Sequence, residues 1–294
     1  MTSRSKELQD VLDVLELRRE GPLTFTATSL ERRTGRVFGG QVLAQALLAA
    51  GATLPADAGT APRLPHSVHG YFLRPGRVEV PIVLEVEELR DGGSFSARRT
   101  HALQNDVPIL SMITSFQEQQ EGLEHAEEPP TVPGPEDLRS AREVISGVDH
   151  PAARFMLRHG AFDLRHVEGH LYLPETLPPA ATRHCLWMRS RGGVPDDQLL
   201  HRALLAYACD QVMLEPILRA LGISWLSEGL NMASLDHAMW WHRDVRVDEW
   251  LLYVLDSPSA QGGRGLGTAR VFDERGRLVA TIAQEGMVRM APAQ

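Results

Sequence analysis

The chain has 294 residues, which is enough for about two ordinary domains. Hydrophobic residues make up 43% and charged residues 23%, and these globular values exclude a disordered chain, a collagen-like repeat and a disulfide-rich miniprotein. The net charge is −8, so we expect no general binding to nucleic-acid phosphates.

The cysteines and the two ends of the chain indicate the cellular location of the protein. Cys185 and Cys209 lie in apolar stretches outside any CxxC pair, which predicts reduced core residues. The first thirty residues show no signal peptide, and no run reaches the ~18 apolar residues of a membrane span. Residues 291–294 (APAQ) are not a peroxisomal signal. We therefore expect a cytoplasmic protein with no membrane partner.

In the first part of the chain, alternating apolar and polar residues predict strands. Gly39 and Gly40 open an apolar helix that Gly51 ends, and a turn at Asn105-Asp106 separates the last two strands. The predicted helix covers residues 41–50, and the predicted strands cover 23–28, 66–74, 81–90, 94–104 and 109–117.

Residues 118–159 differ in composition from what precedes them. Many acidic residues are followed by four prolines at 129, 130, 133 and 135. Such a segment is not expected to sustain a buried element and predicts a linker. A second proline-rich patch at 173–179 predicts a loop.

The second part repeats the order of the first. Residues 195–197 (PDD) predict a helix start, and the helix runs without interruption to about Leu221, where Gly222 ends it. The predicted strands cover 184–190, 233–241, 250–257, 265–272 and 278–288, with a turn at Arg275-Gly276 before the last.

Three landmarks keep nearly one offset between the two parts. Residues 41–43 and 211–213 differ by 170, residues 109–110 and 278–279 by 169, and His69 and His237 by 168. An internal duplication is the economical interpretation.

Each copy then has one apolar helix, which must be enclosed, and strands joined by short turns, which form an antiparallel sheet. The sequence predicts an α+β fold in which each of two sheets wraps around a helix. The units are residues 1–117 and 160–294, joined by the linker 118–159, and they pair their sheets at an otherwise open edge.

Five segments in this order resemble the acyl-CoA thioesterase II family, and the resemblance covers about residues 8 to 290. They are residues 38–46 (FGGQVLAQA), 66–76 (HSVHGYFLRPG), 89–99 (LRDGGSFSARR), 234–243 (SLDHAMWWHR) and 279–286 (VATIAQEG). The resemblance implies a double hot-dog fold. It also implies hydrolysis of fatty acyl-CoA thioesters by an activated water, without a covalent intermediate.

The resemblance also implies a catalytic trio of an Asp, a Thr or Ser, and a Gln. Carried over by motif, the trio falls on Asp210, Ser234 and Gln284, with Ser in place of Thr at the hydroxyl position. The residues themselves support this in part. Asp210 interrupts a helix almost free of charge, and a buried carboxylate must be paired or hydrogen-bonded.

The duplication sharpens the argument for an asymmetric site. The counterpart of Asp210 is Gly40, and that of Gln284 is Ser115, so the fold itself requires neither polar residue. Each also has a simpler interpretation, since Asp210 can fill a gap in the core and a strand glutamine usually faces outward. An acid, a hydroxyl and an amide can together hold and activate a water.

Four further residues are candidates for substrate binding. Backbone N–H groups at Gly39 and Gly40 can receive the oxyanion. His69 has a structural or substrate-lining role, and Arg264 lies in a glycine-rich turn that can hold a CoA phosphate or simply be solvated. The twelve histidines show no zinc spacing, so we expect no metal and no cofactor beyond the CoA of the substrate.

The predicted function is therefore acyl-CoA hydrolysis in fatty acid metabolism, in a protein that forms homo-oligomers. One alternative is a non-catalytic acyl-CoA-binding or regulatory hot-dog protein. Another is a hot-dog enoyl-CoA hydratase, which normally pairs a histidine with a carboxylate, but no histidine lies near Asp210 on the second helix. No GxSxG elbow occurs, which argues against an α/β-hydrolase. The sequence does not define the preferred acyl chain.

Overall fold

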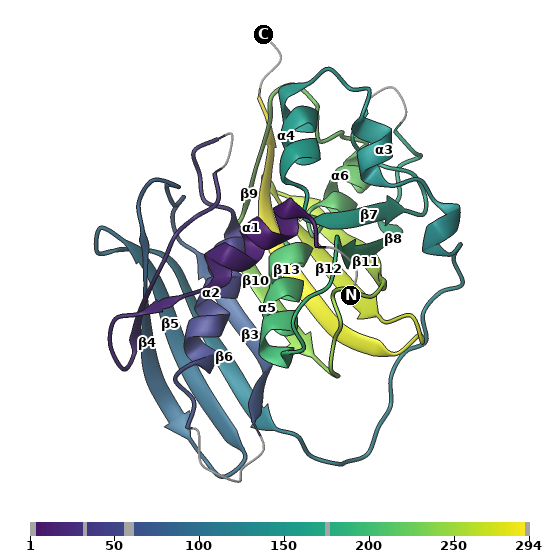
Figure 1. Ribbon diagram of the computed structural model, residues 1–294. Helices are drawn as coiled ribbons and strands as arrows, with labels where there is room; N and C mark the ends of the chain where they lie inside the picture. Colours follow the sequence, from purple (N-terminus) through teal and green to yellow (C-terminus); the bar gives the residue numbers. More distant parts are fainter. Residues whose placement is uncertain (1–3, 32–33, 56–61, 174–176, 292–294) are drawn as a thin grey trace.

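The computed structural model describes residues 4–31, 34–55, 62–173 and 177–291 (Figure 1). Residues 174–176 of the second proline-rich patch, and residues 292–294, lie outside the described residues. No helix in the described ranges is long and apolar enough to cross a membrane.

Thirteen strands in the described ranges form one antiparallel sheet, ordered β1-β2-β4-β5-β6-β3-β10-β13-β12-β11-β8-β7, with β9 beside β13. The first half supplies β1 (Arg18–Arg19), β2 (Thr24–Ala27), β3 (Arg63–Phe72), β4 (Ile82–Asp91), β5 (Phe95–Gln104) and β6 (Val107–Glu118). The second half supplies β7 (Phe162–His166), β8 (Arg183–Ser190), β9 (Leu230–Ser234), β10 (Asp236–Trp241), β11 (Leu251–Gln261), β12 (Arg264–Phe272) and β13 (Leu278–Met290). The predicted strands are confirmed to within a few residues, with two exceptions. The strand predicted at 233–241 is divided into β9 and β10, and β1 and β7 were not predicted.

The two halves meet at β3 and β10, which pair in the middle of the sheet. In Figure 1 the purple-to-blue half and the green-to-yellow half lie side by side across this junction. The predicted pairing of the two sheets is confirmed. The turn between β5 and β6 is formed by Asn105 and Asp106, which both have positive φ (51° and 61°), as a type I′ hairpin turn requires.

The helices in the described ranges are α1 (Lys6–Leu15), α2 (Gly39–Gly51), α3 (Ala141–Ile145), α4 (Pro151–His159), α5 (Gln198–Cys209) and α6 (Glu215–Leu221), with a short 3₁₀ turn at Pro135–Asp137. Helix α2 packs on β4, β5 and β6, and α6 packs on the corresponding strands β11 and β12. Each half therefore has its own helix against its own sheet, as predicted.

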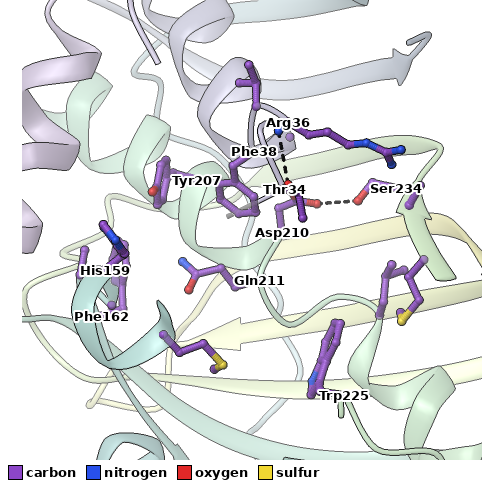
Figure 2. Close-up of a pocket in the computed structure, with 18 of the residues that line it drawn as sticks. Thr34, Arg36, Phe38, His159, Phe162, Tyr207, Asp210, Gln211, Trp225 and Ser234 are labelled. Atoms are coloured by element: carbon purple, nitrogen blue, oxygen red, sulfur yellow. Dashed lines mark hydrogen bonds between the residues drawn. The ribbon is translucent and has the colours of Figure 1, made fainter. Parts of the chain in front are cut away.

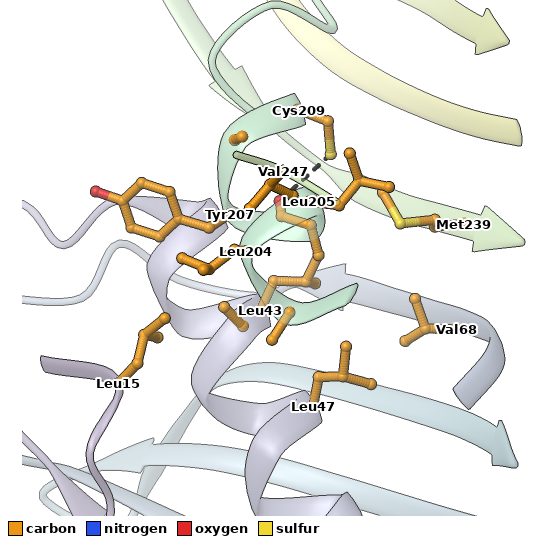
Figure 3. Close-up of a cluster of buried hydrophobic side chains, with 14 of the residues drawn as sticks. Leu15, Leu43, Leu47, Val68, Leu204, Leu205, Tyr207, Cys209, Met239 and Val247 are labelled. Carbon is orange, nitrogen blue, oxygen red and sulfur yellow. Dashed lines mark hydrogen bonds between the residues drawn. The ribbon is translucent and has the colours of Figure 1, made fainter. Parts of the chain in front are cut away.

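Helix α5 packs against α2 in the centre of the molecule. Figure 3 shows Leu43 and Leu47 of α2 and Leu204 and Leu205 of α5 in this core, and all four are at most 1% exposed. Cys209 at the end of α5 is also buried, and neither it nor Cys185 forms a disulfide. The prediction of reduced core cysteines is confirmed.

The prediction of one continuous helix from about 195 to 221 is wrong. Helix α5 ends at Cys209, Asp210 is its C-cap, and α6 begins only at Glu215 after a turn. Asp210 stands at this break, and groups outside the helix hold its carboxylate. Gly222 then ends α6 in the left-handed conformation, with φ 66°, as predicted.

The strand registers confirm the duplication and reveal a shared irregularity. Pro65 pairs with Phe116 but Ser67 pairs with Ser115, so β3 holds one extra residue there. In the second half Ser234 pairs with Gly286 but Ala238 pairs with Ala283, which again leaves one extra residue. Both copies therefore carry a bulge at the same place, and a bulge redirects a side chain.

This register corrects two of the predicted counterparts. His69 is exposed whereas His237 is 1% exposed, and a slip of one residue moves a strand side chain to the opposite face. The counterpart of His237 is therefore Val68. By the same criterion Gln284 corresponds to Thr114 and not to Ser115, since Gln284 and Thr114 are both fully buried.

The prediction of no buried element in 118–159 is also wrong. Helices α3 and α4 lie in this segment, at the top of the second half in Figure 1. Ala141, Ile145 and Ala153 are buried in a cluster with Tyr172. The capping box of Ser140 and Glu143 begins α3, a local signal that the acidic and proline-rich average conceals.

Candidate active site

A cavity of about 920 Å³ lies between the two halves. The start of α2, the turn after α5 and the end of β9 form one side, and α3, α4 and β7 form the other (Figure 2). Its apolar lining includes Phe38, Phe72, Ile145, Leu164, Leu214 and Trp225. This volume is typical of a cavity for a small-molecule ligand.

The Asp210 carboxylate lies in the wall of this cavity and accepts three hydrogen bonds. Its Oδ2 accepts from the Gly40 N–H at 2.7 Å, and its Oδ1 accepts from Ser234 Oγ at 2.9 Å and from Gln284 Nε2 at 2.8 Å. Because Gly40 is in the first turn of α2, the positive end of that helix also faces the carboxylate. Gly40 and Asp210, which the duplication predicts to be counterparts, therefore contact each other directly.

Ser234 is the last residue of β9, beside the bulge that separates this strand from β10. The bulge accounts for the direction of its side chain, which lines the cavity and points to Asp210 (Figure 2). The counterpart of Ser234 in the first half is Pro65, which has no polar side chain.

Gln284 is fully buried behind this pair, and the described residues that line the cavity do not include it. Its Nε2 donates to both Asp210 Oδ1 and Ser234 Oγ, at 2.8 Å each. The three residues of the predicted trio are thus in mutual contact. Both amide hydrogens of Gln284 are donated within the trio, one to the carboxylate and one to the hydroxyl.

Gly39 and Gly40 lie where only glycine fits. A Cβ at Gly39 would be 2.9 Å from Asp210 Oδ2, and a Cβ at Gly40 would be 2.5 Å from the Tyr207 carbonyl oxygen. The Gly40 N–H already donates to Asp210, so the expectation that it receives an oxyanion does not match the structure. Gly39 lines the cavity.

The other two candidates lie away from the described lining of the cavity. His69 is exposed on the outer face of β3, with its ring against Trp240 at 5.0 Å between centroids. Arg264 at the start of β12 is half exposed and pairs with Glu285. Among the described residues, no cluster of His, Cys, Asp and Glu could hold a metal ion.

Sequence reasoning missed three features of the site. Arg36 lines the cavity, and α3 and α4 supply much of its far wall. His237 is buried behind Gln284 and hydrogen-bonded to it. The burial of His237 follows only from the correct register, because the offset of 168 pairs it with the exposed His69.

A second buried polar cluster borders the cavity at Glu215, the first residue of α6. Its Oε2 accepts from His166 Nε2 at 2.8 Å, and its Oε1 accepts from Trp225 Nε1 at 3.1 Å. Burial alone would raise the pKa of Glu215, but the imidazoles of His166 and His184 hold it well below its ordinary range. Burial lowers the pKa of His184. His184 Nε2 on β8 lies 3.4 Å from the same Oε2, so these contacts join α6 to β7 and β8.

Two family models match consecutive parts of the chain. Residues 21–117 match the Acyl-CoA thioesterase N-terminal domain, and residues 127–288 match the Acyl-CoA thioesterase C-terminal domain. Acyl-CoA thioesterase 2 of Haemophilus influenzae is 33% identical over 97% of this chain and 98% of its own length.

Solved structures are also similar to this chain. An acyl-CoA thioesterase II, TesB2, from Mycobacterium marinum is 38% identical, with a TM-score of 0.78, over 96% of this chain and 99% of its own. A hot-dog protein from Alicyclobacillus acidocaldarius shares the fold at 20% identity, with a TM-score of 0.76, over 97% of this chain and 99% of its own.

The fold and the two matching family models define a double hot-dog thioesterase. The chain belongs to the acyl-CoA thioesterase II family, and its activity is hydrolysis of acyl-CoA thioesters. The predicted fold and activity are confirmed, and the binding-protein and hydratase alternatives are set aside.

Proposed function

We propose that Asp210 is the general base of this hydrolysis and that water attacks the thioester carbonyl directly. The observation that carries the proposal is the Asp210 carboxylate in the cavity wall, held by donors from α2, β9 and β13. These three bonds fix its position, and Oδ2, which among the described residues accepts only from Gly40, keeps one lone pair that can accept from the water. A base held within hydrogen-bond reach of the water is what general base catalysis needs.

In this reaction a water bound to Asp210 gives its proton to the carboxylate as its oxygen forms a bond to the carbonyl carbon. The tetrahedral oxyanion then collapses, the C–S bond breaks, and the CoA thiolate leaves and takes up the proton. Gly39 lies at the N-terminal end of α2 and lines the cavity. The oxyanion would be stabilised at this end of the helix. Ser234 holds one oxygen of the base in place.

Substitution of Ser234 tests direct attack by water. We expect Ser234→Ala to lower kcat by about tenfold, the cost of one hydrogen bond, and Ser234→Thr to keep most of the activity. If Ser234 were instead an acylated nucleophile, its removal would abolish turnover. Release of thiol followed with a thiol-trapping reagent measures both variants, and complete loss in Ser234→Ala would overturn the proposal.

The cavity also suggests how the substrate lies. Arg36 is exposed at the cavity, and no described residue pairs with its guanidinium, while the apolar lining extends toward Ile145 and Trp225. We assign Arg36 to the CoA phosphates and the apolar lining to the acyl chain. A guanidinium binds phosphate through charge-assisted hydrogen bonds.

We expect Arg36→Ala to raise KM for an acyl-CoA by about tenfold, the cost of one charge-assisted bond. KM for the matching acyl-N-acetylcysteamine, which has no phosphate, should stay unchanged. Arg264→Ala is the control, because Arg264 is paired with Glu285 on β12. If only Arg264→Ala raised KM, the assignment of Arg36 would be wrong. The CoA phosphates would then bind at the glycine-rich turn of Arg264, as the sequence suggested.

The remaining proposals rest on the sequence. They are the absence of a cofactor, a homo-oligomeric state, a cytoplasmic location, and the division into units 1–117 and 160–294 with the linker 118–159 between them.

A further inference from the structure

His237 lies on β10 at the position next to Ala238, which pairs with Ala283 of β13. Continuing this register by one residue brings His237 directly opposite Gln284. The two side chains are on the inner face, with exposed fractions of 1% and 0%. His237 Nδ1 and Gln284 Oε1 are 2.6 Å apart, the shortest contact that the Gln284 amide makes among the described residues.

The donors and acceptors leave one consistent assignment for this pair. As the proposed base, the Asp210 carboxylate only accepts, so the atom of Gln284 that faces it must be Nε2. Gln284 Oε1 therefore faces His237, and because this oxygen only accepts, His237 Nδ1 must carry a hydrogen. The Cys209 sulfur lies 3.7 Å from Nε2 on the far side of the ring.

Rotation of the Gln284 amide by half a turn would set like groups against each other at both Asp210 and His237. Oε1 would then face the carboxylate oxygen of Asp210, and Nε2 would face the Nδ1–H of His237. Asp210 and Ser234 by themselves anchor only the nitrogen end of the amide. His237 anchors the oxygen end.

The duplicated half shows that the fold does not need this pair. The counterparts of His237 and Gln284 are Val68 and Thr114, which are paired in β3 and β6 and are also buried. The Thr114 hydroxyl has no hydrogen-bond partner among the described residues. In the half that lacks Asp210, Val68 and Thr114 therefore fill the same sheet position without a hydrogen bond between their side chains.

We propose that His237 is a positioning residue for the thioesterase reaction, whose Nδ1–H holds the Gln284 amide so that Nε2 faces Asp210 and Ser234. This inference rests on the proposed role of Asp210. His237 does not contact the cavity among its described lining residues, so it acts on the reaction only through Gln284.

The first test compares two variants of nearly equal size. Asparagine can place an amide N–H where the Nδ1–H lies, whereas leucine has a similar branched shape and no donor. We expect His237→Leu to lower kcat by about tenfold to a hundredfold with little change in KM, since the Gln284 oxygen loses its buried partner. His237→Asn should keep most of kcat. Equal losses in both variants would show a packing role and overturn the proposal.

A double-mutant cycle isolates the path through Gln284. In a Gln284→Met background there is no amide to orient, so His237→Leu should lower kcat by no more than about twofold further. An unchanged loss in that background would contradict the proposal.

A measurement on the unmodified enzyme covers the case in which His237→Leu fails to fold. Nitrogen-15 NMR of the imidazoles distinguishes an Nδ1–H from an Nε2–H tautomer, and the His237 signals are those absent in His237→Asn. We expect the Nδ1–H form, and the Nε2–H form would overturn the inference. If the role of Asp210 were wrong instead, Asp210→Asn would stay active while His237 kept the Nδ1–H form, so the two failures are distinguishable.

Discussion

Asp210→Asn is expected to lower kcat by about 10²–10⁴-fold with little change in KM, the range by which a general base contributes. Asparagine keeps the size of the side chain and one acceptor oxygen, which can still accept from Gly40. It cannot take a proton from water, and its NH₂ group would meet the N–H of Gln284 or the hydroxyl of Ser234. Steady-state thiol release at saturating acyl-CoA measures the effect.

The control is Asp163→Asn, because Asp163 also lines the cavity but is paired with Arg165 on β7. This variant should keep kcat within about twofold of the unmodified enzyme, as expected for a group outside the reaction. The assignment of the base fails if Asp210→Asn turns over normally, or if Asp163→Asn loses as much activity as Asp210→Asn.

Gly267→Ala is expected to have the second large effect, on stability and activity together. Gly267 on β12 pairs with Gln284 on β13, and a Cβ at this position would lie 2.0 Å from the Met213 carbonyl oxygen. Because that atom belongs to the backbone of the turn after Asp210, the turn itself would have to move away from the sheet. Overpacking of this kind costs about 1–3 kcal/mol, and we expect a lower unfolding midpoint.

The displaced turn would also pull Asp210 away from Gln284, so kcat should fall by about tenfold, the cost of one lost hydrogen bond. Gly193→Ala is the matched control, because nothing lies within 4 Å of a Cβ there and its φ is not positive. Thermal unfolding and thiol release measure both variants. Equal unfolding midpoints for the two substitutions would show that the close approach of the turn is unimportant.

Much of the fold was predictable because its signals are local. Alternating strands, the Asn105-Asp106 turn, and glycines at both ends of α2 depend on neighbours in the chain, and each was found. The offset of 170 pairs Gly40 with Asp210, and the structure places these two residues within hydrogen-bond distance. The resemblance to the family identified the three polar residues, and the structure brings them within hydrogen-bond distance.

The errors came from features that depend on distant parts of the chain. Helix periodicity continues through Asp210, whereas the structure ends the helix there. The Asp210 carboxylate is bonded to Gly40, 170 residues away in the sequence, and to Ser234 and Gln284. The average composition of 118–159 concealed two short helices that fold onto β7 and the cavity.

The sequence by itself determined the two copies, the order of their strands, and which copy carries an acid, a hydroxyl and an amide. Only the tertiary structure decided how those groups are used. A bulge of one residue reverses which side chains face inward, and no local pattern reports it. For that reason His237 emerged beside Gln284 only after the strands were paired.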